Sequence, residues 1–298
     1  EIVDSAGPPS IPSLVSANSG GTINLTGEQT GGGFSAGSYA GGVVIKNSTV
    51  SSFNGSVTLV GKVGVPSGVA QVSRGFSLET GARITSNSVV TLTGEVGASA
   101  SANSYGGVLA SGATVASTGG NVGLSGTLNN PAISAGTGLS VGGRVESSGQ
   151  VALTGSATVG GSAGTGLEIL PTAVISSASL GVTATGSVSS STTATFLVAA
   201  SIGGTISTTS AINITGAVSA PSAVNASGVV ITGAVTGTNS GNQLNITGTG
   251  VPAPSPSTSR SIYINGGTVS STGGQIKLTG DRMELAGVVN SSTGRTMI

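Results

Sequence analysis

The sequence has 298 residues, 53 of them glycine, lacks histidine, cysteine and tryptophan, and its 9 basic and 9 acidic residues give a net charge of 0. This balance excludes electrostatic attraction to nucleic acid or to an anionic membrane surface, and the missing cysteine excludes disulfides. Hydrophobic residues at 37% and a mean hydropathy of +0.36 are too high for a disordered chain, although Gly and Ser tracts also suit linkers.

The first segment, residues 1–19, differs from the rest of the chain. Its prolines favour extended backbone; they are Pro8, Pro9 and Pro12. Its apolar residues need a surface to cover them; they are Ile11, Leu14 and Val15. We therefore expect an extended N-terminal arm at 1–19, followed by one domain at 20–298. The start at Glu1 rather than Met is typical of a processed chain or an excised segment.

From Gly20 onward one short phrase recurs. It reads GGTINLTG at 20–27, GGNVGLSG at 119–126 and GGQIKLTG at 273–280. Apolar residues alternate with others ahead of a glycine, which predicts a strand with one buried face that the glycine closes. The closing glycines are Gly27, Gly61, Gly94, Gly126, Gly155, Gly186, Gly216, Gly248 and Gly280. Their spacing of roughly 29 to 34 residues indicates a repeat architecture.

Further strands are expected within each repeat. A middle strand is predicted at Val43, Phe76, Leu139, Leu167 and Ile262. A third is predicted at Val50, Ile84, Val115, Val145, Ile175, Ile206 and Val269. A short segment after the closing glycine suggests a fourth, at Val63, Val96, Val159, Val188 and Val218. Gly, Ser, Asn and Thr between these segments supply the turns.

Strands this short cannot bury their apolar faces alone. They can do so if every repeat forms one coil of a stack, in which each strand pairs with the equivalent strand of the next coil. The fold class expected is all-β: a single parallel β-helix (β-solenoid) of about nine coils, right-handed, with ladders of Val, Ile and Leu inside. Leu124 is expected to point inward and Lys277 outward. A β-propeller is the alternative, but it needs longer repeats with aromatic signatures. Insertions after the closing glycines are expected to form loops on one edge.

Catalytic motifs are weak. Two Gly-x-Ser-x-Gly matches, at 33–37 and 160–164, lack a histidine to act as base. Glu79 and Glu168 are expected on equivalent strands three coils apart, about 14 Å, which is too far for a glycosidase pair. Glu146 belongs to another strand, where a same-face pair with Arg144 is expected. We therefore expect no enzyme activity and no catalytic or cofactor-binding residues.

Metal sites and glycosylation are also weighed. Repeated calcium sites need an Asp in each repeat, whereas only Asp4 and Asp281 are present, so no metal or other cofactor is expected. Glycosylation sequons occur at Asn24, Asn213, Asn245 and Asn290. The first three fall on outward strand positions, where a structural role is the simpler interpretation. Asn213 and Asn245 are one coil apart and are expected to hydrogen-bond to each other.

The phrases GGNVGLSG, GQVALTG and GGTVSSTGGQIKLTG resemble the β-strand repeats of large bacterial surface proteins of the filamentous haemagglutinin type. The resemblance covers nearly the whole chain from Gly20. It implies an extracellular, cell-surface rod used for adhesion or as a fibre, with no catalytic residues to carry over. The family's secretion-signal domain is not visible in the sequence.

Two functions remain open. The first is a non-enzymatic extracellular structural or adhesive rod, whose partners are other copies of itself stacked head to tail. The N-terminal arm is expected to dock across the junction by added-strand pairing, and the alternative is that it folds back and caps its own first coil. Assembly residues expected at the two ends are Ile11, Leu14, Val15, Leu285, Val288, Val289 and Ile298. The second is a carbohydrate-binding or carbohydrate-cleaving β-helix that contacts host or surface glycans through its loops. The aromatic residues expected there are Phe34, Tyr39, Tyr105 and Tyr263. Neither nucleic acid nor an inserted membrane is an expected partner.

Overall fold

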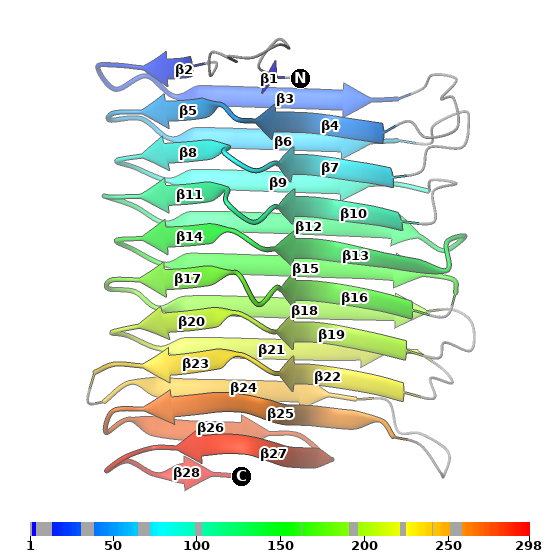
Figure 1. The fold of residues 1–298 in the computed structure, drawn as a ribbon, viewed down its shortest axis with the longest axis vertical. Helices are drawn as coiled ribbons and strands as arrows, with labels where there is room; N and C mark the ends of the chain where they lie inside the picture. The colour runs from blue at the N-terminus through cyan, green and yellow to red at the C-terminus, as the bar shows by residue number, and fades with distance from the viewer. Residues whose placement is uncertain are drawn as a thin grey trace.

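The structure, a computed structural model, describes residues 2–3, 14–30, 39–64, 72–98, 103–161, 163–190, 196–220, 225–239, 241–250 and 258–298. These residues form a parallel β-solenoid without helices, which confirms the expected fold class. Strands of two sheets lie one above another in register, and the chain descends from one end of the rod to the other (Figure 1). Among the described residues no helix could span a membrane.

Sheet B forms the back layer in Figure 1 and contains the repeated phrase. Its ten strands within the described residues are β3 (Ile23–Gln29), β6 (Val57–Val63), β9 (Val90–Val96), β12 (Val122–Asn130), β15 (Val151–Val159), β18 (Val182–Ser190), β21 (Ile212–Ser219), β24 (Gln243–Thr249), β26 (Gln275–Thr279) and β28 (Thr296–Met297). Neighbours pair in parallel, so that Leu92, Leu124 and Leu153 occupy equivalent positions in successive coils.

Sheet A forms the front layer and has two columns of strands. The first column contains β1 (Ile2–Val3), β4 (Tyr39–Lys46), β7 (Val72–Leu78), β10 (Asn103–Leu109), β13 (Ala135–Val141), β16 (Ala163–Ile169), β19 (Phe196–Ile202) and β22 (Asn225–Ile231). The second contains β2 (Leu14–Ala17), β5 (Thr49–Ser52), β8 (Arg83–Ser86), β11 (Thr114–Ser117), β14 (Arg144–Ser147), β17 (Val174–Ser177), β20 (Thr205–Thr208) and β23 (Ala234–Gly237). Near the C-terminal end, β25 (Arg260–Ser271) and β27 (Met283–Asn290) extend across both columns. The predicted middle and third strands correspond to these two columns.

The number of regular coils is smaller than expected. Seven coils of about 31 residues have three separate strands, from β4–β6 to β22–β24, rather than nine. The layers at the two ends differ because β1 and β2 are short and because the two sheet A strands are continuous in β25 and β27. In Figure 1 the chain runs leftward through sheet A in front and rightward through sheet B behind as it descends, which is a right-handed coil.

Where it is described, the N-terminal arm pairs with the first coil of its own chain, which is the alternative to docking on another copy. Ile2–Val3 pairs with β4, and Leu14–Ala17 pairs with β5 of the same chain. Apolar residues explain this placement, since Val15 and Ala17 pack against the buried cluster. Ile11 and the three prolines lie outside the described residues.

The predicted fourth strand is wrong, because the strands of sheet B do not end at the repeated glycine. In β12 the strand continues from Val122 through Gly126 to Asn130. A Cβ atom at Gly126 would lie only 2.2 Å from the carbonyl oxygen of Gly138, in the following sheet A strand. The glycine therefore lets the backbones of the two sheets touch at this point rather than terminating a strand.

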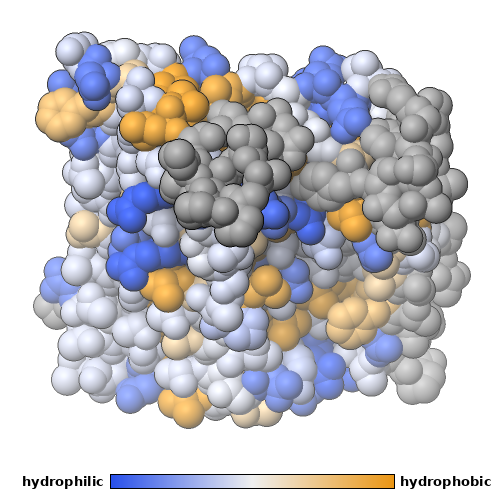
Figure 2. Space-filling model, turned by 45° about the horizontal axis from the view of Figure 1, so that its top comes forward, coloured by the Kyte–Doolittle hydropathy of each residue, from blue (hydrophilic) through white to orange (hydrophobic). Residues whose placement is uncertain are grey.

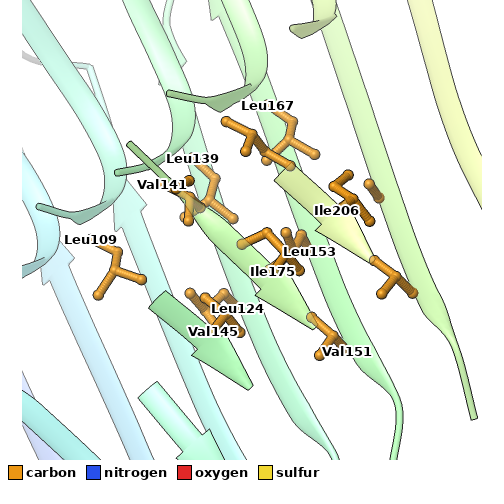
Figure 3. Packing of buried hydrophobic residues seen from close by; sticks show 14 of the residues in the cluster. Leu109, Leu124, Leu139, Val141, Val145, Val151, Leu153, Leu167, Ile175 and Ile206 are labelled. Carbon is orange, nitrogen blue, oxygen red and sulfur yellow. The ribbon is translucent and has the colours of Figure 1, made fainter. Parts of the chain in front are cut away.

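This close approach of backbone recurs from coil to coil and divides the interior. A Cβ atom at Gly61, Gly94, Gly155, Gly186, Gly216 or Gly248 would likewise lie 1.8 to 2.2 Å from a sheet A carbonyl oxygen. The larger cluster of buried side chains lies on one side of this glycine column, and a smaller cluster that includes Val96, Leu128 and Leu197 lies on the other. Figure 3 shows the larger cluster, in which Leu139 and Leu167 follow one another in equivalent positions and Leu124 and Leu153 come from sheet B.

Inward serines fix the turns between the second column and sheet B. Ser147 at the end of β14 donates a hydrogen bond to the carbonyl oxygen of Gly120, 2.6 Å away in the preceding coil, and accepts one from the amide of Gly149. Ser177 makes the equivalent contacts with Gly149 and Gly181. Because these hydroxyls are buried, their bonds satisfy polar groups that would otherwise lack water.

Candidate functional site

A groove on the outer face of sheet A is the first candidate site among the described residues. It lies across the first column, from β16 through β19 and β22 to β25, and has a volume of about 370 Å³. Its lining residues are Thr165, Glu168, Phe196, Val198, Ser201, Asn225, Ser227, Val230, Thr258, Arg260, Tyr263 and Asn265. Register places most of these side chains in rows along the rod, one from each coil.

The backbone pattern of these strands explains why the rows point outward. In β16, Gly166 and Leu167 are both buried in succession, and Thr165 and Glu168 on either side of them are partly exposed. Gly166 belongs to the close approach between the sheets and Leu167 packs inside, so Thr165 and Glu168, which flank this pair, point to the outside. The equivalent positions give Ser227 and Val230 in β22, and Arg260 and Tyr263 in β25.

Aromatic side chains lie on opposite sides of the groove, since Phe196 is level with Ala163 of β16 and Tyr263 is level with Glu168, five residues further along that strand. Phe196, the first residue of β19, is 57% exposed, although no strand packing requires a large apolar side chain there. Tyr263 in β25 has the guanidinium of Arg260 over its ring, 4.4 Å from the ring centroid, a cation–π contact. Two rings on one polar groove provide apolar contact area where the rest of the face offers short hydroxyl side chains.

Charged groups in and beside the groove are held by neighbours. Arg260 forms an ion pair with Glu284 of β27 and donates a hydrogen bond to the carbonyl oxygen of Thr258, 3.0 Å away. The Glu168 carboxylate accepts a hydrogen bond from Ser140, 3.1 Å away in the preceding coil. These contacts fix the position of a donor at one end of the groove and an acceptor at the other.

A second groove of about 370 Å³ lies across the second column near the N-terminal end, and its lining includes Phe53, Arg83, Thr85 and Glu146. The expected pair of Arg144 with Glu146 is present beside it. The hydrogen bond from Arg144 lowers the pKa of Glu146, against the opposing effect of burial, and the same bond raises the pKa of Arg144. Phe53 is the only aromatic among the residues that line this groove, so it offers less apolar contact area than the first.

The aromatic residues predicted for ligand-facing loops have different positions in the structure. Tyr263 lines the first groove but belongs to strand β25, and Tyr105 belongs to β10, where Arg74 lies 5.8 Å from its ring centroid. Tyr39 begins β4, and Phe34 lies outside the described residues. Tyr105 and Tyr263 are five strands apart, about 24 Å, so they do not form one site.

Phe196 and Arg260 were not predicted as site residues. The signal that identifies them is the register of the repeats, because equivalent outward positions stack into rows. The serines of both Gly-x-Ser-x-Gly matches, Ser35 and Ser162, lie outside the described residues. Within the described part of the chain, no group of three or more side chains is placed to hold a metal ion.

Residues expected to mediate assembly divide into two sets. Leu14, Leu285, Val288 and Ile298 are exposed at the ends of the rod. Val15 and Val289 instead pack against the interior of their own chain. The expected contact between Asn245 and Asn213 is confirmed by a hydrogen bond of 2.9 Å between their side chains.

Searches against known protein families, curated proteins and solved structures find no match to this chain. The fold class is therefore defined by the structure alone: it is a parallel β-solenoid, with a groove on the outer face of sheet A.

Proposed function

We propose that this protein is a non-enzymatic structural or adhesive rod outside the cell, extended by head-to-tail stacking. The observation that carries the proposal is the pair of open ends. Among the described residues, β3 pairs only with β6, and β28 pairs only with β26, so each end of sheet B offers one unpaired edge. Because all strands are parallel, the last layer of one copy can continue the ladders into the first layer of the next.

Apolar side chains on these ends support the same proposal. Leu285 and Val288 on β27 are exposed, Val288 at 55%, and Leu14 is exposed on β2 at the other end. Figure 2 shows apolar side chains, in orange, near the N-terminal end, whereas most of the visible surface is pale and weakly polar. Open strand edges with apolar side chains favour association. A second copy, or further polypeptide, stacked on an end would cover both the open strand edges and these apolar side chains.

The arrangement of carboxylates favours a non-enzymatic role. Glu168 and Glu284 occupy the same outward row, but four strand spacings separate them, about 19 Å. A glycosidase pair lies within about 5 to 10 Å. The resemblance to haemagglutinin-type repeats supports a bacterial cell-surface location for the rod.

Electron microscopy of the purified chain tests the proposal. We expect fibres whose axial repeat equals the length of one chain's rod. Val288→Lys places a charge on the exposed face of β27 and should reduce fibre formation, because stacking would bury an unpaired ammonium. Leu180→Lys is the matched control, since Leu180 is 63% exposed in a turn away from the ends.

Single rods at high protein concentration, in the wild type as in Val288→Lys, would contradict stacking. Fibres that form equally well in both proteins would mean that the β27 face is not the junction.

A further inference from the structure

The groove between β16 and β25 is suited to a ligand recognised by side chains rather than by main chain. β16, β19 and β22 each pair with a strand on both sides, so their backbone N–H and C=O groups are already used in the ladders. A peptide that adds a strand needs a free sheet edge, which this face does not offer. What the face offers is side chains alone.

Side chains that both donate and accept hydrogen bonds dominate the floor. Hydroxyls come from Thr165, Ser201 and Ser227, and amides come from Asn225 and Asn265. Hydroxyl and amide groups match a ligand whose own groups are hydroxyls, because each partner can act in either role. The rings of Phe196 and Tyr263 match flat apolar surface, which a sugar ring presents on its C–H faces.

Charge selects among ligands of this kind. Arg260 is the one cation and Glu168 the one anion among the residues that line the groove, and Arg260 is already paired with Glu284. An acidic glycan would have to compete with Glu284 for Arg260 and would face the carboxylate of Glu168. A ligand without charge meets neither cost.

The separation of the two rings also fits a chain of sugars. Register places Tyr263 two strand spacings from Phe196 along the rod, about 10 Å, and five residues from it across the rod, about 17 Å. The straight path between the rings is therefore about 19 Å long and crosses β22 near Ser227, and this length is close to that of four hexose units at about 5 Å each.

We infer that this groove binds a neutral oligosaccharide of three to four hexose units, extended obliquely across sheet A between Phe196 and Tyr263. The inference deepens the proposed function, since it supplies the adhesive ligand class of the rod. Arg260, held by Tyr263 and Glu284, donates to a sugar hydroxyl at the Tyr263 end. Asn225 and Ser227 bind the units between the two rings.

Titration calorimetry with neutral tetrasaccharides tests the inference. The probes are the β-1,4-linked tetramers of glucose, mannose and N-acetylglucosamine, and the acidic comparison is tetragalacturonate. We expect at least one neutral probe to bind, with tetragalacturonate at least tenfold weaker. Tyr263→Ala and Phe196→Ala should each weaken that binding about tenfold or more, because each removes one ring from the groove.

Tyr105→Ala is the matched control, because Tyr105 also lies beneath an arginine on the same outer face but outside the groove. It should leave the affinity unchanged, and circular dichroism should show that all three variants keep the fold. No binding of any neutral probe at millimolar concentration, equal or tighter binding of tetragalacturonate, or equal losses in Tyr105→Ala and Tyr263→Ala would each overturn the inference. Fibres of Tyr263→Ala in the microscope would show that assembly and glycan binding are separate properties.

Discussion

Individual glycines determine how closely the two sheets approach. Gly126 and Gly123 belong to the same strand, β12, but point to opposite sides. A Cβ atom at Gly126 would lie 2.2 Å from the Gly138 carbonyl oxygen and 2.8 Å from the Gly107 amide nitrogen, whereas a Cβ atom at Gly123 would meet nothing within 4 Å. Both contacts of Gly126 are backbone atoms held in strands, so they cannot move aside as a flexible side chain would.

Gly126→Ala is therefore expected to destabilise the protein by about 3 kcal/mol or more, since overpacking at rigid backbone is costly. Gly123→Ala is expected to stabilise it by about 0.5 to 1 kcal/mol, because alanine loses less conformational freedom in a strand than glycine. Urea denaturation followed by circular dichroism measures both changes. Changes of the same sign and size would show that the sheets do not touch at the glycine column.

At one place in the interior, a glycine makes room for a large side chain in the neighbouring coil. Phe76 is fully buried in β7, and the equivalent residue in the next coil is Gly107. A Cβ atom at Gly107 would lie 2.3 Å from the Phe76 ring, so the absence of a side chain makes room for that ring. The sequence shows both residues, but only the register between coils shows that they meet.

Within each strand of sheet B, the alternation of buried and exposed residues fixes which side chains can change. Leu124 in β12 is buried, and Lys277 in β26 is exposed, as the sequence pattern predicts. Asn213 and Asn245 occupy partly exposed positions of the same sheet and bond across coils. The inward row is apolar, and the outward row tolerates polar and charged groups.

Leu124→Asp is expected to lower the free energy of unfolding by several kcal/mol, about 3 to 5, because it buries an unpaired charge between stacked coils. Lys277→Ser is expected to change it by less than about 0.5 kcal/mol, as at most surface sites. Thermal melts of the two variants measure the contrast. Equal shifts of the melting temperature would contradict the assignment of inner and outer faces.

The positions of most strands are predictable from the sequence, because the same pattern of alternating apolar residues occurs in every repeat. The strand positions near Leu124, Leu139 and Val145 follow from alternation, and their stacking follows from the period. The continuation of β12 beyond Gly126 was not predictable, since its cause is the carbonyl oxygen of Gly138 in the other sheet. The groove was not predictable for a similar reason, because its lining residues come from four strands that only the register between coils brings side by side.

At the scale of the whole molecule, the ends are less regular than the middle. Seven coils with three separate strands form the middle, while β25 and β27 at the C-terminal end are continuous across both columns of sheet A. The spacing of the repeated phrase alone suggests nine coils, because the phrase is also present in β3 and β26, where the sheet A strands differ from those of the regular coils. The groove lies in the half of the rod nearer the C-terminal end, and none of its lining residues belongs to β27 or β28, so the proposed stacking would leave it open.

The direction of the hydrogen bonds gives the rod a mechanical property. Bonds between coils run parallel to the rod, so tension on its two ends loads every bond of a layer together. When one layer gives way, its coil of about 31 residues unwinds to roughly 100 Å of extended chain, about twenty times the 4.8 Å it occupied. Single-molecule pulling should show steps of that length, and one cooperative rupture without steps would contradict it. If the proposed rod is attached at both ends, flow would lengthen it coil by coil, and this unwinding would dissipate load that otherwise acts on the attachment.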